Sequence, residues 1–452
     1  MTRQSLPFTL RLLPLLILAA SGVATSAQAQ SLVDLYTAAR GYDATYQSAK
    51  SQFDATMAKS EQAKALMLPT AGLTASVSQI NQDTQLPAAS AKNYNYDTQS
   101  AAIAVSQPLY RPGNWASYDQ GKKQVALAQA QLAQAEQDLI VRVSQAYFDV
   151  LAATDNLAFV KSQKAAVGEQ LASAKRNFEV GTSTITDSRE AQARFDLVTA
   201  QELAAENDLR VKSIALNQLV GVSNAQPKPL SAPVQLADLA PTDVEQWVGE
   251  AQANHPGIKQ QEVALEVARL ETAKAEAGHK PTLDLTGSFT ASGSQNAPSS
   301  TSLQTVDTRA NVATVGLAFN MPLFAGFSVQ NRVKETIALE DKARTDLEAT
   351  RRAVAQGTRT AFFGVQSGLG QVKALEAAET SSQSALDANK LGYQVGVRIN
   401  IDVLNSQSQL FDTKAKLAKA RYDVLVGGLK LRQAAGTLKA DDLQPINGQL
   451  AK

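Results

Sequence analysis

The sequence of 452 residues contains no cysteine and only two histidines. Without cysteine there can be no disulfide framework, so the fold must be held by packing alone, and no lipid-modified cysteine can follow an export signal. The two histidines, His255 and His279, are distant in the sequence and have no neighbours at metal-ligand spacing. No nucleophile elbow, phosphate-binding loop or metal motif is present either. The sequence therefore predicts no enzyme, no cofactor and no metal site.

Net charge and long apolar segments are also scarce. The formal net charge is +1, from 43 basic and 42 acidic residues, which gives no reason to expect nucleic acid as a partner. An apolar run at residues 12–20 follows Arg3 and Arg11 and precedes a small-x-small sequence at residues 27–29. The run is shorter than the roughly 20 residues that span a bilayer, so we expect residues 1–29 to be a cleaved signal peptide. No later stretch suits a transmembrane helix, so any membrane part of the mature chain must be a β-barrel.

What the sequence does contain is an internal duplication. Residues 177–181 are echoed by residues 392–396, and the offset from Gly181 to Gly396 is 215. Further pairs follow in the same order: 69–76 with 281–288, 108–110 with 322–324, and 146–148 with 361–363. This period is far longer than the roughly 20–50 residues of solenoid repeats. The sequence therefore predicts two similar half-molecules.

Each half carries two segments in which apolar and polar residues alternate, at about 73–78 and 102–106 and again at about 283–289 and 314–321. Alternation over about eight to ten residues is typical of a strand with one apolar face, in a membrane or in a soluble two-sided sheet. The connecting residues 81–100 and 292–309 are rich in Asn, Gln, Ser and Thr, so we expect surface loops there. Aromatic residues gather near the predicted strand ends and suggest a membrane girdle as a group: Tyr94, Tyr96, Tyr110, Trp115, Phe324 and Phe327.

Long helical patterns follow each predicted hairpin, over about residues 117–177 and 328–391. About 60 residues at 1.5 Å each give roughly 90 Å of helix, which requires a neighbouring helix for burial and predicts coiled-coil-like packing. Returning helices are expected over about 187–219 and 402–434. Shorter helices are expected before each first strand, at 32–40, 44–66, 242–254 and 256–277.

These elements give a division of the chain into repeated parts. We expect periplasmic helices at 30–66 and 242–279, β-hairpins at 67–111 and 280–324, long helices at 112–222 and 325–436, a linker at 223–241 and a C-terminal segment at 437–452. One chain would supply four strands, whereas bacterial barrels need about eight or more. If the strands lie in a membrane, two or three chains must therefore share one barrel.

Several of these segments together resemble the TolC family of outer-membrane export proteins, over nearly the whole mature chain in one register. The segments that carry the resemblance are residues 185–187, 277–286, 392–398 and 401–404. The family implies a homotrimer whose twelve strands form one barrel in the outer membrane of a Gram-negative bacterium, in contact with its lipid. Below the membrane, a helical barrel would cross the periplasm as one continuous duct.

The same resemblance implies partners and a passive role. An inner-membrane pump or a secretion ATPase, with a periplasmic adaptor, would deliver drugs, proteins or both to the lower end of the duct. The adaptor would grip the two turns between long helices, at Val180, Gly181 and Thr182 and at Val395, Gly396 and Val397. A glycine is expected in such turns for structural reasons alone, because helices commonly end on a left-handed glycine.

The resemblance also implies a gate at this end. Asp402 would contribute to a ring of carboxylates around the closed pore, and the family's second acid, one turn later, is Asn405 in this chain. The ring should therefore carry less charge, with a weaker preference for cations. Bonds from Tyr393 and Arg398 to Thr186 and Asp187, within and between subunits, would hold the gate shut. Lys390 also stands where the family has an acid, which puts one auxiliary link in doubt.

A simpler role is open to both acids. Asp187 and Asp402 stand near the start of a returning helix, where a carboxylate contributes about 0.3–1 kcal/mol and an N-cap Asp is common. An alternative function is equally simple, namely a periplasmic or surface helical scaffold without a pore. It would explain the helices and the signal peptide, but not the duplicated alternating hairpins.

Overall fold

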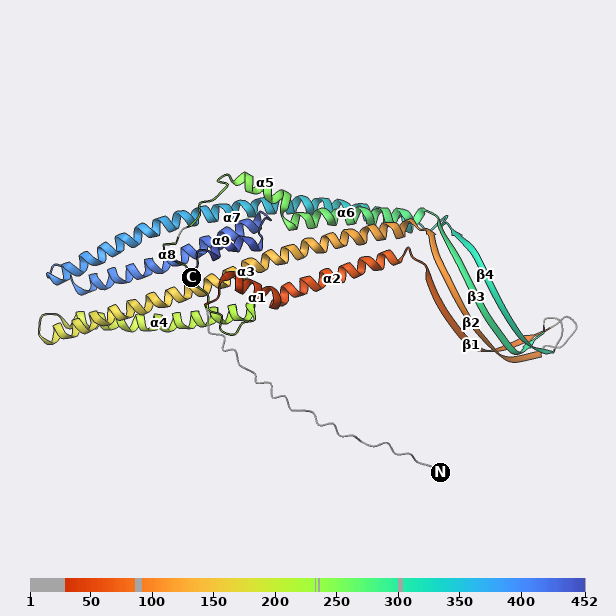
Figure 1. Ribbon diagram of the computed structural model, residues 1–452, viewed down its shortest axis with the longest axis horizontal. Coiled ribbons are helices and arrows are strands. Elements are labelled where there is room, and N and C mark those ends of the chain that lie inside the picture. The colour runs from red at the N-terminus through yellow and green to blue at the C-terminus, as the bar shows by residue number, and fades with distance from the viewer. Residues whose placement is uncertain (1–28, 86–91, 232, 235, 300–303, 452) are drawn as a thin grey trace, which may run out of the picture.

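Two very long helices determine the shape of the molecule (Figure 1). α3 (Pro112–Glu179) has 68 residues and α7 (Ser328–Gln394) has 67, which is about 100 Å each at 1.5 Å per residue. The computed structural model describes residues 29–85, 92–231, 233–234, 236–299 and 304–451. The predicted signal peptide, except for its last residue, lies outside the described residues.

The order of elements repeats along the chain, which confirms the predicted duplication. The first half contains α1 (Leu32–Tyr42), α2 (Ala44–Ala65), β1 (Thr70–Thr84), β2 (Lys92–Tyr110), α3 and α4 (Ile185–Val220). The second half contains α5 (Val244–Asn254), α6 (Pro256–Glu276), β3 (Thr282–Pro298), β4 (Thr305–Asn320), α7 and α8 (Asn400–Ala434). A short helix, α9 (Leu443–Asn447), lies near the C-terminus.

The long helices are buried by different neighbours along their length. α3 packs against α2 and α6 near the sheet and against α4 toward the other end, and α7 packs in the same way against α6 and then α8 (Figure 1). α3 also contacts α8, so the two halves lie against each other. Each half thus ends in a helical hairpin, α3/α4 or α7/α8, at the end of the molecule farthest from the sheet.

The largest apolar core lies midway along the helices, where α1, α3, α4, α8 and α9 meet. Its centre is an aromatic cluster: Tyr147 and Phe148 meet edge to face at 5.4 Å, and Phe148 stacks on Tyr422 at 5.5 Å. The Tyr147 hydroxyl donates to the backbone carbonyl of Lys228 at 2.9 Å. This hydrogen bond, together with an isolated antiparallel β-bridge between Leu230 and Leu450, holds the linker between the halves against the core.

The four strands form one antiparallel sheet in the order β1-β2-β3-β4. β2 pairs with β3, so the sheet joins the two halves, and β1 and β4 are its free edges within one chain. At the junction with the helices, the guanidinium of Arg111 donates to both carboxylate oxygens of Asp284, at 2.8 and 2.5 Å. This bidentate pair fixes the start of α3 against β3.

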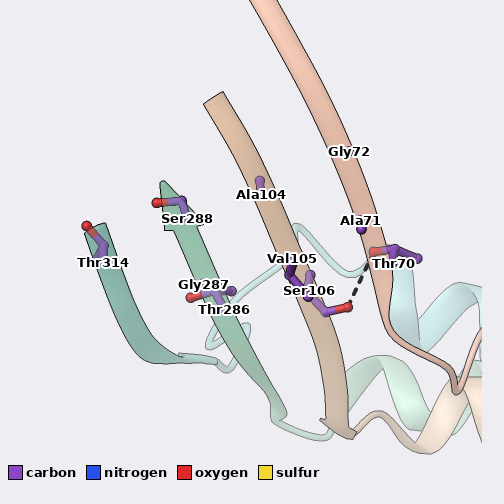
Figure 2. A pocket seen from close by; sticks show the side chains of 10 residues that line it. All are labelled: Thr70, Ala71, Gly72, Ala104, Val105, Ser106, Thr286, Gly287, Ser288 and Thr314. Atoms are coloured by element: carbon purple, nitrogen blue, oxygen red, sulfur yellow. Dashed lines mark hydrogen bonds between the residues drawn. The ribbon is translucent and has the colours of Figure 1, made fainter. Parts of the chain in front are cut away.

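The two faces of the sheet differ in polarity. One face carries large apolar side chains that are exposed in the single chain: Leu73, Val77, Ile103, Phe289, Val315, Leu317 and Phe319. The other face carries small and hydroxylated residues, and a hollow there is lined by residues from all four strands, among them Thr70, Ala104, Ser288 and Thr314 (Figure 2). The alternation predicted from the sequence is therefore present, and the apolar face lacks a cover in one chain.

The strands are longer than the sequence pattern predicted, at 15, 19, 17 and 16 residues. Much of residues 81–100 and 292–309, predicted as surface loops, is strand, and that prediction was wrong. Polar side chains occupy both faces there and bond across strands, as Ser76 does to Ser100 at 2.8 Å and Ser294 to Thr308 at 2.6 Å. The backbone ladder continues where the apolar alternation stops, because hydrogen bonding of the backbone does not depend on apolar side chains.

The predicted aromatic girdle has one repeated feature. At the helix end of the sheet, Tyr110 meets Trp115 edge to face at 5.3 Å in the first half, and Phe324 meets Phe327 at 5.4 Å in the second. Tyr94, by contrast, is buried. A girdle role for the exposed members stays a prediction.

Candidate functional site at the helical tips

The two hairpins reverse direction by the same backbone turn. Gly181 and Gly396 have φ angles of 80° and 81°, in the left-handed region that favours glycine. In each turn a backbone amide also donates a hydrogen bond to a carbonyl of the last helical turn. The Thr182 amide donates to the Asn177 carbonyl at 2.8 Å, and the Val397 amide donates to the Gly392 carbonyl at 2.9 Å. This is the Schellman arrangement that ends many helices. The tips predicted to contact an adaptor therefore have a structural reason for their glycines.

In the first tip, Asp187 is held by its own turn. Thr184 is the N-cap of α4, and its hydroxyl accepts from the Asp187 amide at 3.2 Å while the Asp187 carboxylate accepts from the Thr184 amide at 3.1 Å. Ser183 donates a further hydrogen bond to the same carboxylate at 2.6 Å. The hydrogen bond from the Ser183 hydroxyl lowers the pKa of Asp187 most, and the bonds from the Thr184 amide and hydroxyl lower it further, because all three favour the charged form. The carboxylate serves as part of a capping box at the third helical position, not as the N-cap itself.

In the second tip, the equivalent positions carry no such cap. The N-cap of α8 is Ile399, which has no side-chain hydrogen bond to offer. Asp402 again stands at the third helical position, but its carboxylate lies 3.7 Å from the guanidinium of Arg398, and its side chain is 33% exposed. Asn400, between them, is 1% exposed, and neither polar atom of its side chain has a partner within the described part of the chain. The second tip is therefore held by weaker contacts than the first.

Polar side chains also cross from one hairpin to the other. Arg194 on α4 donates to the side-chain oxygen of Asn405 on α8 at 2.7 Å. Nearer the turns, the side-chain amide nitrogen of Asn177 lies 3.5 Å from the hydroxyl oxygen of Tyr393, at the outer limit of a hydrogen bond. Farther up, Gln163 on α3 bonds Ser408 on α8 at 3.3 Å, beside a groove between α3, α4 and α8.

Within the described part of one chain, the residues predicted to lock a gate are not bonded to one another. Within the described residues of one chain, no hydrogen bond or ion pair joins Tyr393 or Arg398 to Thr186 or Asp187, because Asp187 is enclosed by its capping box and Arg398 faces Asp402. Asn405, the predicted second member of the pore ring, is bonded across the hairpins. Links between copies of the chain stay a prediction.

Three residues at the tips had not been singled out from the sequence. Arg194 and Asn177 each bond a residue more than 200 positions away, and nothing in the local pattern of one helix predicts such a partner. Asn400 could have been noticed, since an Asn among the apolar residues of a helix start predicts a buried polar group. Its equivalent in the first half, 215 residues earlier, is the exposed Ile185.

Two other kinds of feature are absent from the parts of the chain that the structure describes. No helix there combines the length and apolar character needed to cross a membrane. No group of histidine, aspartate and glutamate side chains there is arranged to hold a metal ion.

The architecture corresponds to a known class. The crystal structure of the outer membrane protein VceC from Vibrio cholerae superposes with a TM-score of 0.75 over 90% of this chain and 96% of that one, at 17% identity. A duplicated chain with a four-stranded sheet at one end and two long helical hairpins at the other thus has the fold of outer-membrane channel proteins.

A family model described as outer membrane efflux protein matches residues 35–222 and 247–437, once in each half. The chain belongs to the outer membrane efflux protein family. It is 35% identical over 441 residues to the outer membrane protein TolC of Vibrio cholerae, covering 97% of this chain and 98% of the relative. It is also 30% identical over 356 residues to the alkaline protease secretion protein AprF of Pseudomonas aeruginosa, covering 78% and 72%.

These relationships decide between the two functions drawn from the sequence. The chain is an export channel of the outer membrane, with a large helical part in the periplasm. A scaffold without a pore is not supported.

Proposed function

We propose that three copies of this chain close a single duct through the outer membrane and the periplasm. The observation that carries the proposal is the sheet, which has four strands, two free edges and an uncovered apolar face. Unpaired backbone groups are costly in lipid, and closed bacterial barrels have about eight strands or more. Pairing β4 of one copy with β1 of the next removes the edges, and three copies give the twelve strands that the family resemblance implies.

In this arrangement, the two faces of the sheet meet different surroundings. The apolar side chains, such as Val77, Val315 and Phe319, contact outer-membrane lipid. The small polar side chains around the hollow in Figure 2 line a water-filled interior. The helical hairpins continue this interior across the periplasm.

The pore narrows where the hairpin tips converge, and Asp402 and Asn405 surround the constriction. Three carboxylates about 7 Å apart at an effective dielectric near 20 would repel by about 2 kcal/mol per pair. The neighbouring Arg398 offsets part of this repulsion within each copy. Bonds from Tyr393 and Arg398 to Thr186 and Asp187 of an adjacent copy would complete the lock, each exposed ion pair adding about 0–1 kcal/mol.

The tips themselves are the docking sites of a periplasmic adaptor. Val180, Val395 and Val397 are each well exposed at the ends of the hairpins, and exposed apolar residues at the end of a rigid element suit a protein contact. An inner-membrane efflux pump or a secretion ATPase supplies the energy. The cargo is drugs, secreted proteins or both, in keeping with a family named for efflux and a relative named for protease secretion.

The test is conductance of the purified protein in a planar bilayer, after gel electrophoresis has established a heat-modifiable trimer. We expect a small, steady conductance that a trivalent cation blocks from the periplasmic side, with block lost in Asp402→Ala. Asp423→Ala is the matched control, because Asp423 lies on the same helix but pairs with Lys419 in solvent, at 2.8 Å. An inserted trimer without conductance, or a soluble monomeric rod, would contradict the proposal.

A further inference from the structure

The starting observation is a cation beside the proposed constriction that the resemblance does not account for. The guanidinium of Arg194 donates to the side-chain oxygen of Asn405 at 2.7 Å. Asn405 lies three residues after Asp402 on α8, which is close to one helical turn and a rise of about 4.5 Å. The contact therefore places a permanent positive charge about one turn from the Asp402 carboxylate, because a guanidinium is charged at all working pH values.

A second cation stands on the other side of the same carboxylate. Arg398 approaches Asp402 at 3.7 Å from the turn that precedes α8. Within the described residues of one chain, no hydrogen bond or ion pair joins Asp187 to either arginine, and its carboxylate accepts hydrogen bonds from Ser183 and Thr184 in the first tip instead. Each copy thus brings two guanidinium groups, Arg194 and Arg398, to the neighbourhood of one open carboxylate.

We propose that Arg194 is a selectivity-determining residue of the constriction in the duct; this inference rests on the proposed function. In a narrow pore with low-dielectric walls, fixed charges of one sign raise the local concentration of the opposite ion. Asp402 alone would favour cations, and Arg194, one turn away in every copy, counteracts that field. The closed channel therefore passes anions nearly as readily as cations, binds a multivalent cation weakly, and imposes little penalty on anionic cargo.

A purely structural role for Arg194 predicts a different result. If Arg194 only ties α4 to α8, then loss of the bond matters and loss of the charge does not. Arg194→Gln separates the two roles, because glutamine keeps an amide donor for Asn405 but carries no charge. Asn405→Ala does the reverse: it removes the bond and leaves the guanidinium in place. Arg194→Lys keeps the charge without the planar donor group.

The experiment measures reversal potential in a potassium chloride gradient and the half-blocking concentration of a trivalent cation, on heat-modifiable trimers in planar bilayers. We expect Arg194→Gln to shift the reversal potential toward cation selectivity and to lower the half-blocking concentration on the order of tenfold at low salt. Arg194→Lys, which keeps the charge, should stay near wild type, and Asn405→Ala should shift selectivity and block much less than Arg194→Gln does. Arg189→Gln is the control, because Arg189 is exposed on the same helix and lies five residues, or about 140°, around it from Arg194.

Two outcomes overturn the inference while leaving the duct intact. One is a conducting Arg194→Gln trimer with wild-type selectivity and block. The other is an Asn405→Ala trimer whose selectivity changes as much as that of Arg194→Gln, since this would assign the effect to the bond. An inserted wild-type trimer that conducts nothing would instead overturn the proposed duct, and the inference with it.

Discussion

The α3/α4 tip and the α7/α8 tip share one backbone turn, yet the helix that follows each turn is held differently. In the first, Thr184 and Asp187 form a capping box that Ser183 reinforces. In the second, Ile399 replaces the capping threonine, and Asp402 is left to a 3.7 Å ion pair. The duplicated turn has thus been kept while its side chains have diverged.

This difference indicates unequal local stability. A threonine cap contributes about 0.5–2 kcal/mol, whereas an exposed ion pair contributes about 0–1 kcal/mol. A buried polar group without a partner, as at Asn400, costs a further 1–3 kcal/mol or so. We therefore expect the first turn of α8 to open more readily than the first turn of α4, which would make the second tip the movable part of the proposed gate.

The largest effect should come from the feature that the two tips share. Gly181→Val and Gly396→Val each force a β-branched residue into the left-handed region, which costs at least about 1–2 kcal/mol. Amide hydrogen exchange at the affected tip should then accelerate about 5- to 30-fold. Gly370→Val, at an open helical position on α7, should leave both tips unchanged. A tip that tolerates valine would show that its left-handed turn is not maintained in solution.

A substitution at the N-cap position should give the first turn of one tip the stability of the other. Ile399→Thr supplies the missing cap three residues before Asp402, and should slow exchange in the first turn of α8 about fivefold, for a gain near 1 kcal/mol. Thr184→Ala should speed exchange at the start of α4 by a similar factor. Ile399→Val is the control for loss of the isoleucine. Equal exchange at the two wild-type tips would remove the basis for the comparison.

Acid should weaken the first tip through Asp187. Its folded-state pKa lies below the ordinary value, so its stabilising contribution is complete above the unfolded-state pKa, near 4, and is lost as pH falls through the folded-state pKa. Protection of the first amides of α4, corrected for intrinsic exchange, should therefore decline as the pH falls below about 4. Asp187→Asn should abolish this pH dependence. Persistence of the decline in that variant would point to another acid.

The smallest effect is expected from the exposed pair in the second tip. Arg398→Gln removes the 3.7 Å contact with Asp402, and within one copy should change exchange at α8 by about twofold or less. The same substitution tests the proposed lock between copies. A marked rise in trimer conductance, far beyond that local effect, would support bonds from Arg398 to an adjacent copy, and unchanged conductance would argue against them.

Much of the fold could be predicted because it depends on local patterns that occur twice. The repeated turns around Gly181 and Gly396 marked the hairpin tips. The long helical patterns before and after each turn predicted the long helices. The ends of the strands could not be predicted, because residues such as Asn81 and Asn93 are polar and pair side chain to side chain at 2.6 Å. Such ladders have the composition of loops.

The candidate site was predictable only along each helix. The capping role of Asp187 follows from its position near a helix start. The contact between Arg194 and Asn405 depends instead on how α4 lies against α8, across 211 positions of sequence. No periodicity within either helix contains that information. The resemblance to a family is no substitute there, since Asn405 is a departure from its pattern.

The matched lengths of the two halves set a limit on how such a chain can change. α3 and α7 differ by a single residue, as do α4 and α8, with 36 and 35. Each inserted residue would move a tip by about 1.5 Å and swing it by about 100°. An insertion in one half alone would leave the tips uneven and rotated. The length of the helical part can therefore change only if both halves change together, in steps of about seven residues, or about 10 Å of helix.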